Sequence, residues 1–337
     1  MSVKRRLAMM IMVCVMVIGS LTGCGTSKTQ ETGEAQTESG SSAKTVIGVS
    51  SWVGYAPLFI AEEKGFFKDH GADVEIKTIE SGADRRSALA SNKIQGMCTT
   101  VDTHIITDAV GVDVVQVLAL DTSCGGDGLV AKNEYQSIKD LAGKKIALDT
   151  TSGSSYFWFQ TLIKEAGMSV DDFDIQSMGS GDAGAAFVAG DVDASMTWEP
   201  WLTNASNTDF GHVMIDSSET PGVIVDSLGF TKEYIDENPD AIQAVIDGWY
   251  DALAYIDENP DDAYSIMANA MGQSVDEFKT SLAGCQYYDE AANKEYFDGQ
   301  IYDIAQSAME LWLEEGTIDK EVDVKSVIDP QFVQKTE

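Results

Sequence analysis

Aromatic and polar side chains gather in segments that could bind a small molecule. Two of these segments follow predicted strands and offer rings, hydroxyls and a carboxylate, at Ser51, Trp52, Tyr55, Thr99, Thr100 and Asp102. Indole and phenol rings can stack on a ligand, although a lone tryptophan is more often a core residue. Ordinary helix capping by Thr100 or Asp102 is an equally good interpretation of the second segment. We predict that both segments contribute to a ligand site.

Two further segments carry more hydroxyls and more aromatic rings. Thr150-Thr151-Ser152-Gly153-Ser154-Ser155-Tyr156 joins a predicted strand to a helix, where glycine lets backbone N–H groups approach an anion or a carbonyl. It lacks the lysine of a Walker motif, so it is not a nucleotide P-loop. Trp198 and Glu199 could stack on a ligand and accept its hydrogen bonds, or they could be a buried indole and a capping carboxylate. We predict ligand contacts from Ser152, Ser154, Ser155, Tyr156, Trp198 and Glu199.

Carboxylates and aromatic rings dominate these segments, to which we add Asp121, and arginine is scarce. Beyond residue 23, Arg85 and Arg86 are the only arginines, and they stand together near a predicted helix start. Paired charges at a helix start are usually solvated, although one of them could reach an anionic ligand. The lining favours a flat N-heterocycle or an amine, through stacking and cation–π contact. Hydroxyls and amides can also hold an oxyanion without arginine.

Strands that alternate with helices must position these segments. Such alternation implies parallel sheets covered by helices, with ligands bound at the carboxyl ends of the strands. The stretch 94–99 resembles 192–197 in pattern, which suggests two similar lobes. Helices are predicted from Ala56 to Lys68 and from Ala83 to Ser91. Strands are predicted at Thr45–Val49, Ala72–Thr78, Ile94–Thr99, Val114–Leu120, Lys145–Leu148, Phe173–Met178, Ala194–Thr197 and His212–Ile215.

The last third of the chain is predicted to be mostly helical, from Asp240 to about Glu315. Tyr-Ile-Asp-Glu-Asn-Pro-Asp occurs at 234–240 and again at 255–261. In each copy asparagine is predicted to cap a helix, proline to occupy its first turn, and the acid to favour its N-terminal dipole. These helices are expected to pack against a lobe.

The start of the chain predicts export and a lipid anchor. Three basic residues, an apolar run from Leu7 to Ile18 and small residues describe a secretory signal peptide over 1–23. The run is too short for a comfortable membrane span. Leu21-Thr22-Gly23-Cys24 resembles a bacterial lipobox, which implies cleavage before Cys24 and lipidation of its thiol; an uncleaved anchor is the alternative. Residues 24–44 then form the lipidated end and a flexible tether.

Composition limits the partners and the chemistry. The net charge of −33 becomes more negative once Lys4, Arg5 and Arg6 are removed, which excludes nucleic acid as a partner. The roughly 290 residues that remain to fold suit two lobes better than one core. Cys98, Cys124 and Cys285 are an odd number and favour small buried thiols, although a disulfide between Cys98 and Cys124 stays open. No spacing indicates a metal site, and no cofactor is expected.

An ordered set of motifs adds a family resemblance. The stretch from Ser51 to Phe67 resembles the substrate-binding proteins of importers for nitrate, taurine, aliphatic sulfonates and the thiamine-precursor pyrimidine. Leu141–Ala147, Gly190–Ala194, Trp198–Trp201 and the paired Asn-Pro helix starts fit the same family. The resemblance implies an α/β, type II periplasmic-binding-protein fold of two lobes with a hinged cleft, plus C-terminal helices. It implies lobe 1 at 45–129 and 223–337, and lobe 2 at 130–222.

Three functions follow from these observations. The first is a monomeric, lipid-anchored binding protein that delivers a solute to an ABC permease and its ATPase outside the cytoplasm. The second is an enzyme, because one branch of the fold resembles a pyrimidine synthase that consumes its own histidine and needs a cysteine-rich iron motif. That motif is absent, and the histidines are His70, His104 and His212. The third is a lipoprotein sensor that presents its ligand to a receptor. We expect the first.

Overall fold

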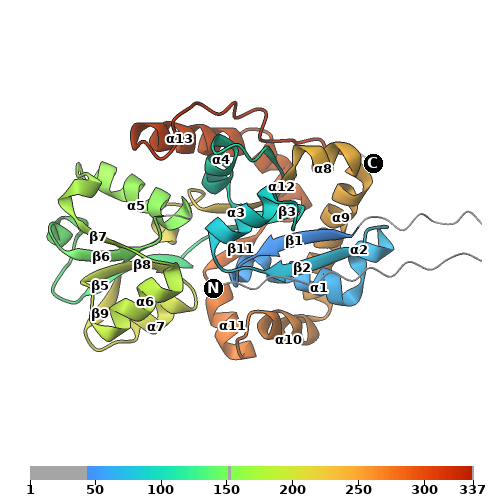
Figure 1. The fold of residues 1–337 in the computed structure, drawn as a ribbon. Helices are drawn as coiled ribbons and strands as arrows, with labels where there is room; N and C mark the ends of the chain where they lie inside the picture. The colour runs from blue at the N-terminus through green and yellow to red at the C-terminus, as the bar shows by residue number, and fades with distance from the viewer. Residues whose placement is uncertain (1–43, 151–152, 336–337) are drawn as a thin grey trace, which may run out of the picture. The chain divides into compact units, whose positions relative to one another are not determined.

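The computed structural model describes residues 44–150 and 153–335, which belong to one compact unit, Ser42–Glu337. Cys24 and the predicted tether lie outside the described residues, apart from Lys44. The strands form two sheets, one in the order β11-β4-β10-β3-β1-β2 and the other in the order β7-β6-β8-β5-β9 (Figure 1). They are β1 (Thr45–Val49), β2 (Val74–Thr78), β3 (Gly96–Thr100), β4 (Val114–Ser123), β5 (Asp127–Lys132), β6 (Lys145–Leu148), β7 (Asp174–Ser177), β8 (Ala194–Trp198), β9 (Gly211–Asp216), β10 (Val225–Thr231) and β11 (Cys285–Tyr287).

The helices connect the strands and fill the last third of the described chain. No helix among the described residues combines the length and the apolarity that a membrane span requires. The helices are α1 (Ala56–Lys64), α2 (Phe66–Asp69), α3 (Gly82–Ala90), α4 (Val101–Ala109), α5 (Gly153–Glu165), α6 (Ser180–Ala189), α7 (Trp201–Ser206), α8 (Lys232–Glu237), α9 (Pro239–Glu258), α10 (Pro260–Ala270), α11 (Val275–Leu282), α12 (Glu290–Phe297) and α13 (Gln300–Glu314).

Both sheets are mixed, so the predicted parallel pairing holds for only part of each sheet. β1 is parallel to β2 and β3, and β6 is parallel to β7 and β8, as the alternation predicts. β10 is antiparallel to β3 and β4, and β5 is antiparallel to β8 and β9. Only residues 124–126 separate β4 of the first sheet from β5 of the second, so the chain crosses between the sheets without a helix. β5 and β10 are each the first strand after the chain crosses from one sheet to the other.

The chain passes from the first sheet to the second between Ser123 and Asp127 and returns between Asp216 and Val225. The lobe limits of 129/130 and 222/223 stay predictions. The helix expected from Ala56 to Lys68 is interrupted at Gly65, whose φ of 83° lies in the left-handed region that glycine tolerates. Two shorter helices, α1 and α2, result, and both pack against α9.

Apolar side chains from both faces of the second sheet form separate clusters. Phe159, Leu162 and Ile163 of α5 belong to one cluster, and Phe187 of α6 and Leu202 of α7 belong to the other. Figure 1 shows α5 on one face of this sheet and α6 and α7 on the opposite face. A larger cluster unites the first sheet with the C-terminal helices, as expected for helices that pack against a lobe.

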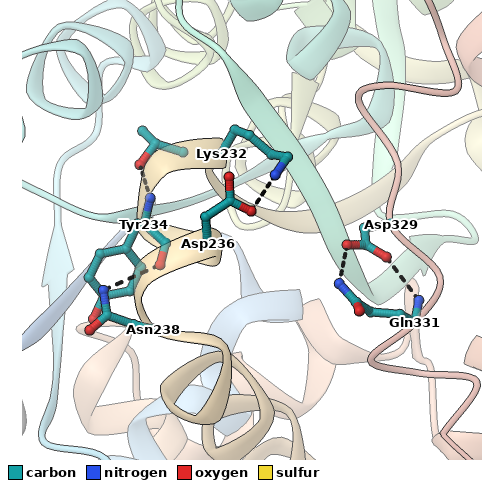
Figure 2. Close-up of polar contacts among 7 residues, drawn as sticks. Lys232, Tyr234, Asp236, Asn238, Asp329 and Gln331 are labelled. Carbon is teal, nitrogen blue, oxygen red and sulfur yellow. Dashed lines mark hydrogen bonds and ion pairs between the residues drawn. The ribbon is translucent and has the colours of Figure 1, made fainter.

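The repeated Asn-Pro motif starts two helices, but not in the expected way. Pro239 and Pro260 open α9 and α10, as predicted. Neither Asn238 nor Asn259 makes a side-chain cap, so the predicted capping is wrong. Figure 2 shows the Asn238 amide turned back toward α8, where it donates to the Tyr234 carbonyl oxygen at 3.3 Å. Asn238 thus completes the end of α8 instead of capping α9, because a single residue separates the two helices.

The three described cysteines are free thiols, so the disulfide that the sequence left open does not form between Cys98 and Cys124. Cys98 is buried and Cys285 is half-buried, while Cys124 is exposed. The interpretation as small buried thiols is therefore correct for Cys98 and wrong for Cys124.

Candidate functional site

A cavity of about 620 Å³ opens where loops from both sheets meet. From the first sheet it receives the segments after β1, β2 and β3 and the start of β10; from the second it receives the start of β5 and the segments after β6, β7 and β8. Carboxyl ends of parallel strands and helix N-termini are where α/β sheets bind ligands. Its lining comprises Ser50, Trp52, Tyr55, Glu80, Ser81, Arg85, Thr99, Thr100, Thr103, Asp127, Asp149, Ser154, Gly179, Ser180, Gly181, Asp182, Trp198, Trp201, Ile224 and Asp226.

The structure brings about half of the predicted ligand residues together at this cavity. Those that line it are Trp52, Tyr55, Thr99, Thr100, Ser154 and Trp198. Six others lie outside the lining: Ser51, Asp102, Asp121, Ser155, Tyr156 and Glu199. Ser152 is outside the described residues. The expectation that loops after strands converge on one site agrees with this geometry, and ligand contact by each residue remains a prediction.

Three tryptophans form a continuous wall, which we call the indole wall: Trp52, Trp198 and Trp201. The Trp52 and Trp198 rings meet edge to face at 5.8 Å, and Trp198 meets Trp201 in the same way at 4.3 Å. Trp52 follows β1, whereas the other two follow or end β8, so the wall joins the two sheets. Such a wall presents ring faces and edges to a bound molecule and excludes water from one side of it.

Asp121 fixes the position of the Trp52 indole. It is completely buried on β4, and its Oδ1 accepts a hydrogen bond from Trp52 Nε1 at 2.9 Å. The Cys285 thiol donates to the same oxygen at 3.4 Å. Burial raises the pKa of Asp121 to about 7. Asp121 therefore positions a lining residue instead of touching the cavity.

Two buried carboxylates do face the cavity. Asp226 at the start of β10 accepts a hydrogen bond from the Tyr55 hydroxyl, and burial raises its pKa well above the usual range. Burial raises the pKa of Asp127, the first residue of β5, to about 7. Both side chains lie on strands that directly follow a crossing of the chain between the two sheets. No strand was predicted at either position, and neither residue was predicted to belong to the site.

Arg85 also lines the cavity, at only 5% exposure. Its Nη1 donates to the carbonyl oxygens of Ile79 at 2.7 Å and Glu80 at 3.0 Å. These bonds tie the guanidinium to the loop before α3, where the Ser81 hydroxyl caps the helix. The expectation of a solvated charge is therefore wrong for Arg85.

The remaining predicted residues support the site from outside. Asp102 is buried on α4 against Gly153 of α5, where a Cβ atom would lie 1.9 Å from Asp102 Oδ2. Burial raises the pKa of Asp102 to about 6. Tyr156 stacks on Trp312 of α13 at 6.0 Å, and Ser155 is buried. The Ser51 hydroxyl donates to Glu80 at 3.2 Å.

Comparison with known proteins identifies the family. The NMT1/THI5-like family matches residues 52–263, more than half of the chain. The chain belongs to this family. Solved structures agree on the fold: the aliphatic sulphonate binding protein SsuA of Escherichia coli superposes with a TM-score of 0.71 at 19% identity, over 87% of this chain and 99% of its own. The fold is that of a periplasmic binding protein, as the resemblance implied.

Two relatives show how much of the chain is similar to curated proteins. The "Putative aliphatic sulfonates-binding protein" of Bacillus subtilis is 26% identical over 334 residues, which cover 96% of each chain. The taurine-binding periplasmic protein of Escherichia coli is 28% identical over 202 residues, or 58% of this chain and 62% of its own. The Bacillus subtilis relative therefore aligns with this chain nearly from end to end, including most of the stretch before residue 44.

Glu199 has a structural role in this family member that can be tested. Its carboxylate accepts hydrogen bonds from the Thr203 hydroxyl at 2.7 Å and the Thr203 backbone at 3.2 Å, so it caps α7. We expect Glu199→Ala to lower the free energy of unfolding by about 0.5–2 kcal/mol, the usual value for a lost cap. Urea unfolding measures this loss. Glu165→Ala, at an exposed position of α5, should change stability by less than about 0.5 kcal/mol. Equal effects of both variants would contradict the capping role.

Proposed function

We propose that this chain is an extracytoplasmic solute-binding lipoprotein of an ABC importer. It captures a small organic solute between two lobes and delivers it to the permease, which an ATPase drives. Family membership, the nearly end-to-end match to a binding protein and a cavity lined from both sheets support this proposal. It acts without catalysis, as a monomer. Lobe 1 comprises residues 45–129 and 223–337, and lobe 2 comprises residues 130–222.

The proposal includes a lipid anchor at Cys24. Cleavage before this residue leaves its thiol, modified by diacylglycerol, as the first residue of the mature chain. The segment 24–44 then tethers the compact unit to the outer face of the membrane, near the permease. The sequence from Met1 to Cys24 supports the anchor.

For the ligand we propose an amine or an aromatic N-heterocycle that carries a positive charge. The indole wall beside Asp127 and Asp226 is the observation that carries this choice. Aromatic faces and carboxylates both attract organic cations, and they do so more strongly in a site that excludes water. Glu80, Asp149 and Asp182 add further acidic groups to the lining.

A sulfonate or another oxyanion is the second candidate, and Arg85 is the observation that favours it. Its buried guanidinium lies in a lining that also contains the N-terminal ends of α5 and α6. Helix N-termini and arginine are typical partners of oxyanions. The relatives named for sulfonates and taurine support the same ligand class.

A thermal-shift screen separates the two ligand classes. The compact unit from Ser42 to Glu337 is heated with choline, benzyltrimethylammonium, 4-aminopyrimidine, taurine, ethanesulfonate or nitrate. A ligand at 100 times its Kd stabilises the folded state by about 2.7 kcal/mol, which raises Tm by several degrees. We expect a shift with the organic cations. A shift with ethanesulfonate and nitrate alone would replace the first ligand class with the second, and no shift with any compound would count against a solute site in this cavity.

A further inference from the structure

Three carboxylates lie together at the base of the indole wall, and we call them the carboxylate trio: Asp121, Asp127 and Asp226. Asp121 of β4 and Asp226 of β10 are direct partners in the antiparallel register. Asp127 follows β4 by four residues and, like Asp226, lines the cavity. The three residues are 0%, 5% and 4% exposed. The trio therefore adjoins the cavity but is shielded from bulk water.

The hydrogen bonds that reach the trio come from neutral groups. Asp121 Oδ1 accepts from Trp52 and Cys285, and Asp226 Oδ1 accepts from Tyr55. Asp121 Oδ2 is buried without a hydrogen-bond partner. No ion pair among residues 44–150 and 153–335 includes a member of the trio. An unpaired buried charge is costly, and three like charges raise that cost further.

Other titratable groups face the trio from every element packed around it. Arg85 of α3 is the one cation among these described groups, and its charge lowers the pKa values of Tyr55 and Cys98 while burial raises both. Its Nη1 is bonded to two carbonyl oxygens and not to the trio. Burial lowers the pKa of His104 to about 4, so this imidazole is neutral. The other facing groups are Asp102 of α4, Glu199 after β8, Cys285 and Tyr287 of β11, and Tyr288.

Electrostatics then requires the trio to hold a proton near neutral pH. Burial raises the pKa of both Asp121 and Asp127 to about 7, and burial beside Asp121 raises that of Asp226 well above its usual range. Like charges in contact cannot all ionise, so they share protons as a group. A cation bound in the cavity stabilises the ionised carboxylates, and it therefore lowers the affinity of the trio for its proton.

We propose that an organic cation bound against the indole wall displaces a proton from the carboxylate trio, so that the cavity exchanges a proton for the positive charge of its ligand. The O–H bond of one carboxylic acid breaks, the proton passes to water, and the carboxylate that remains faces the cation. This inference rests on the proposed function and names the charge class of its ligand. Affinity for a permanent cation should therefore rise with pH, by up to tenfold per unit below about pH 7.

Calorimetry with choline tests the exchange, because the charge of choline does not change with pH. Binding to the compact unit Ser42–Glu337 is measured at pH 6, 7 and 8, in phosphate and in ACES, two buffers that differ in ionisation enthalpy and are not organic cations at these pH values. The difference between buffers counts released protons, and we expect about one per choline at pH 6. Asp226→Asn should lower that number. 3,3-Dimethylbutan-1-ol, the uncharged isostere of choline, should release none. Choline binding that is independent of pH and buffer would overturn the exchange and leave the binding function intact.

A second measurement needs no ligand. The Trp52 indole N–H is bonded to Asp121, so its ¹⁵N–¹H NMR signal reports the ionisation of that carboxyl. The signal is assigned by its loss in Trp52→Phe, and its shift should follow a titration with a midpoint near pH 7. A signal that does not move between pH 5 and 9 would overturn the inference. If choline and benzyltrimethylammonium both fail to bind while ethanesulfonate binds, the cationic ligand and the exchange are both wrong.

Discussion

Replacement of Trp198 by alanine is expected to weaken the binding of benzyltrimethylammonium by about 10- to 100-fold. Trp198 is the middle member of the indole wall and contacts both Trp52 and Trp201. The variant removes one aromatic face and also frees the other two rings to move. An aromatic pair contributes about 0.5–1.5 kcal/mol beyond the buried area, and a cation–π contact in a site that excludes water contributes about 2 kcal/mol. Isothermal titration of the variant and the parent protein at pH 8 measures the difference.

Matched variants distinguish this effect from a loss of folding. Trp198→Phe keeps a ring at the same position and should retain most of the affinity. Phe210→Ala removes an aromatic side chain that is 38% exposed and does not line the cavity, so affinity should stay unchanged. Circular dichroism should show the same folded fraction in all variants, so a loss of affinity in Trp198→Ala alone is not a loss of folding. If Trp198→Ala binds as tightly as the parent protein, the indole wall is not the ligand surface.

The local sequence pattern was enough to predict most strands, but not those that follow a crossing of the chain between the sheets. β1 and β6 have the predicted limits, and six other predicted strands occur with shifted ends. Each of these strands is a short apolar run next to a helix or a turn, which is the signal that periodicity detects. The ordered motifs also indicated the correct family.

β5 and β10, which follow the two crossings between the sheets, carried no such signal. β10 contains Asp226, Ser227 and Gly229, residue types that are depleted in strands. Its partners are β3 and β4, more than a hundred residues earlier, so its stability comes from pairing that no local window contains. β5 was missed for the same physical reason. The two carboxylates that face the cavity lie at the starts of these strands, and they were missed with them.

The sequence predicted which loops form the cavity, but it did not predict which of their side chains line it. Asp121 and Asp226 are register partners on adjacent strands, yet only Asp226 lines the cavity. Arg85 and Arg86 are neighbours on α3, and only Arg85 reaches the lining. The rotation of α3 on the sheet decides between them, and the Arg85 side chain packs on β1, where a Cβ atom on Gly48 would lie 3.8 Å from its Cγ and Cδ atoms.

Raising the pH from about 5 to 8 is expected to destabilise the ligand-free protein. Asp121 and Asp127 have pKa values of about 7 in the folded state, against about 3.9 for an unfolded aspartate. Between these values the folded state holds more protons than the unfolded state, so the free energy of unfolding falls as pH rises. The loss is on the order of 2–4 kcal/mol, since coupled carboxyls do not contribute independently. Asp102, with a pKa of about 6, adds a change of the same sign.

His104 opposes this trend. Its folded-state pKa of about 4 lies below the usual 6.5, so its contribution to stability rises with pH over that interval and is complete above it. The carboxyls therefore dominate above about pH 6.5, where the His104 contribution no longer changes. Urea unfolding at pH 5, 6, 7 and 8 measures the curve, and Asp127→Asn should flatten it. Asp182→Asn changes an exposed lining carboxylate and should keep the parent slope. Stability that stays level or rises between pH 6 and 8 in the parent protein would mean that the trio is already ionised and that an unseen cation or water shell balances its charge.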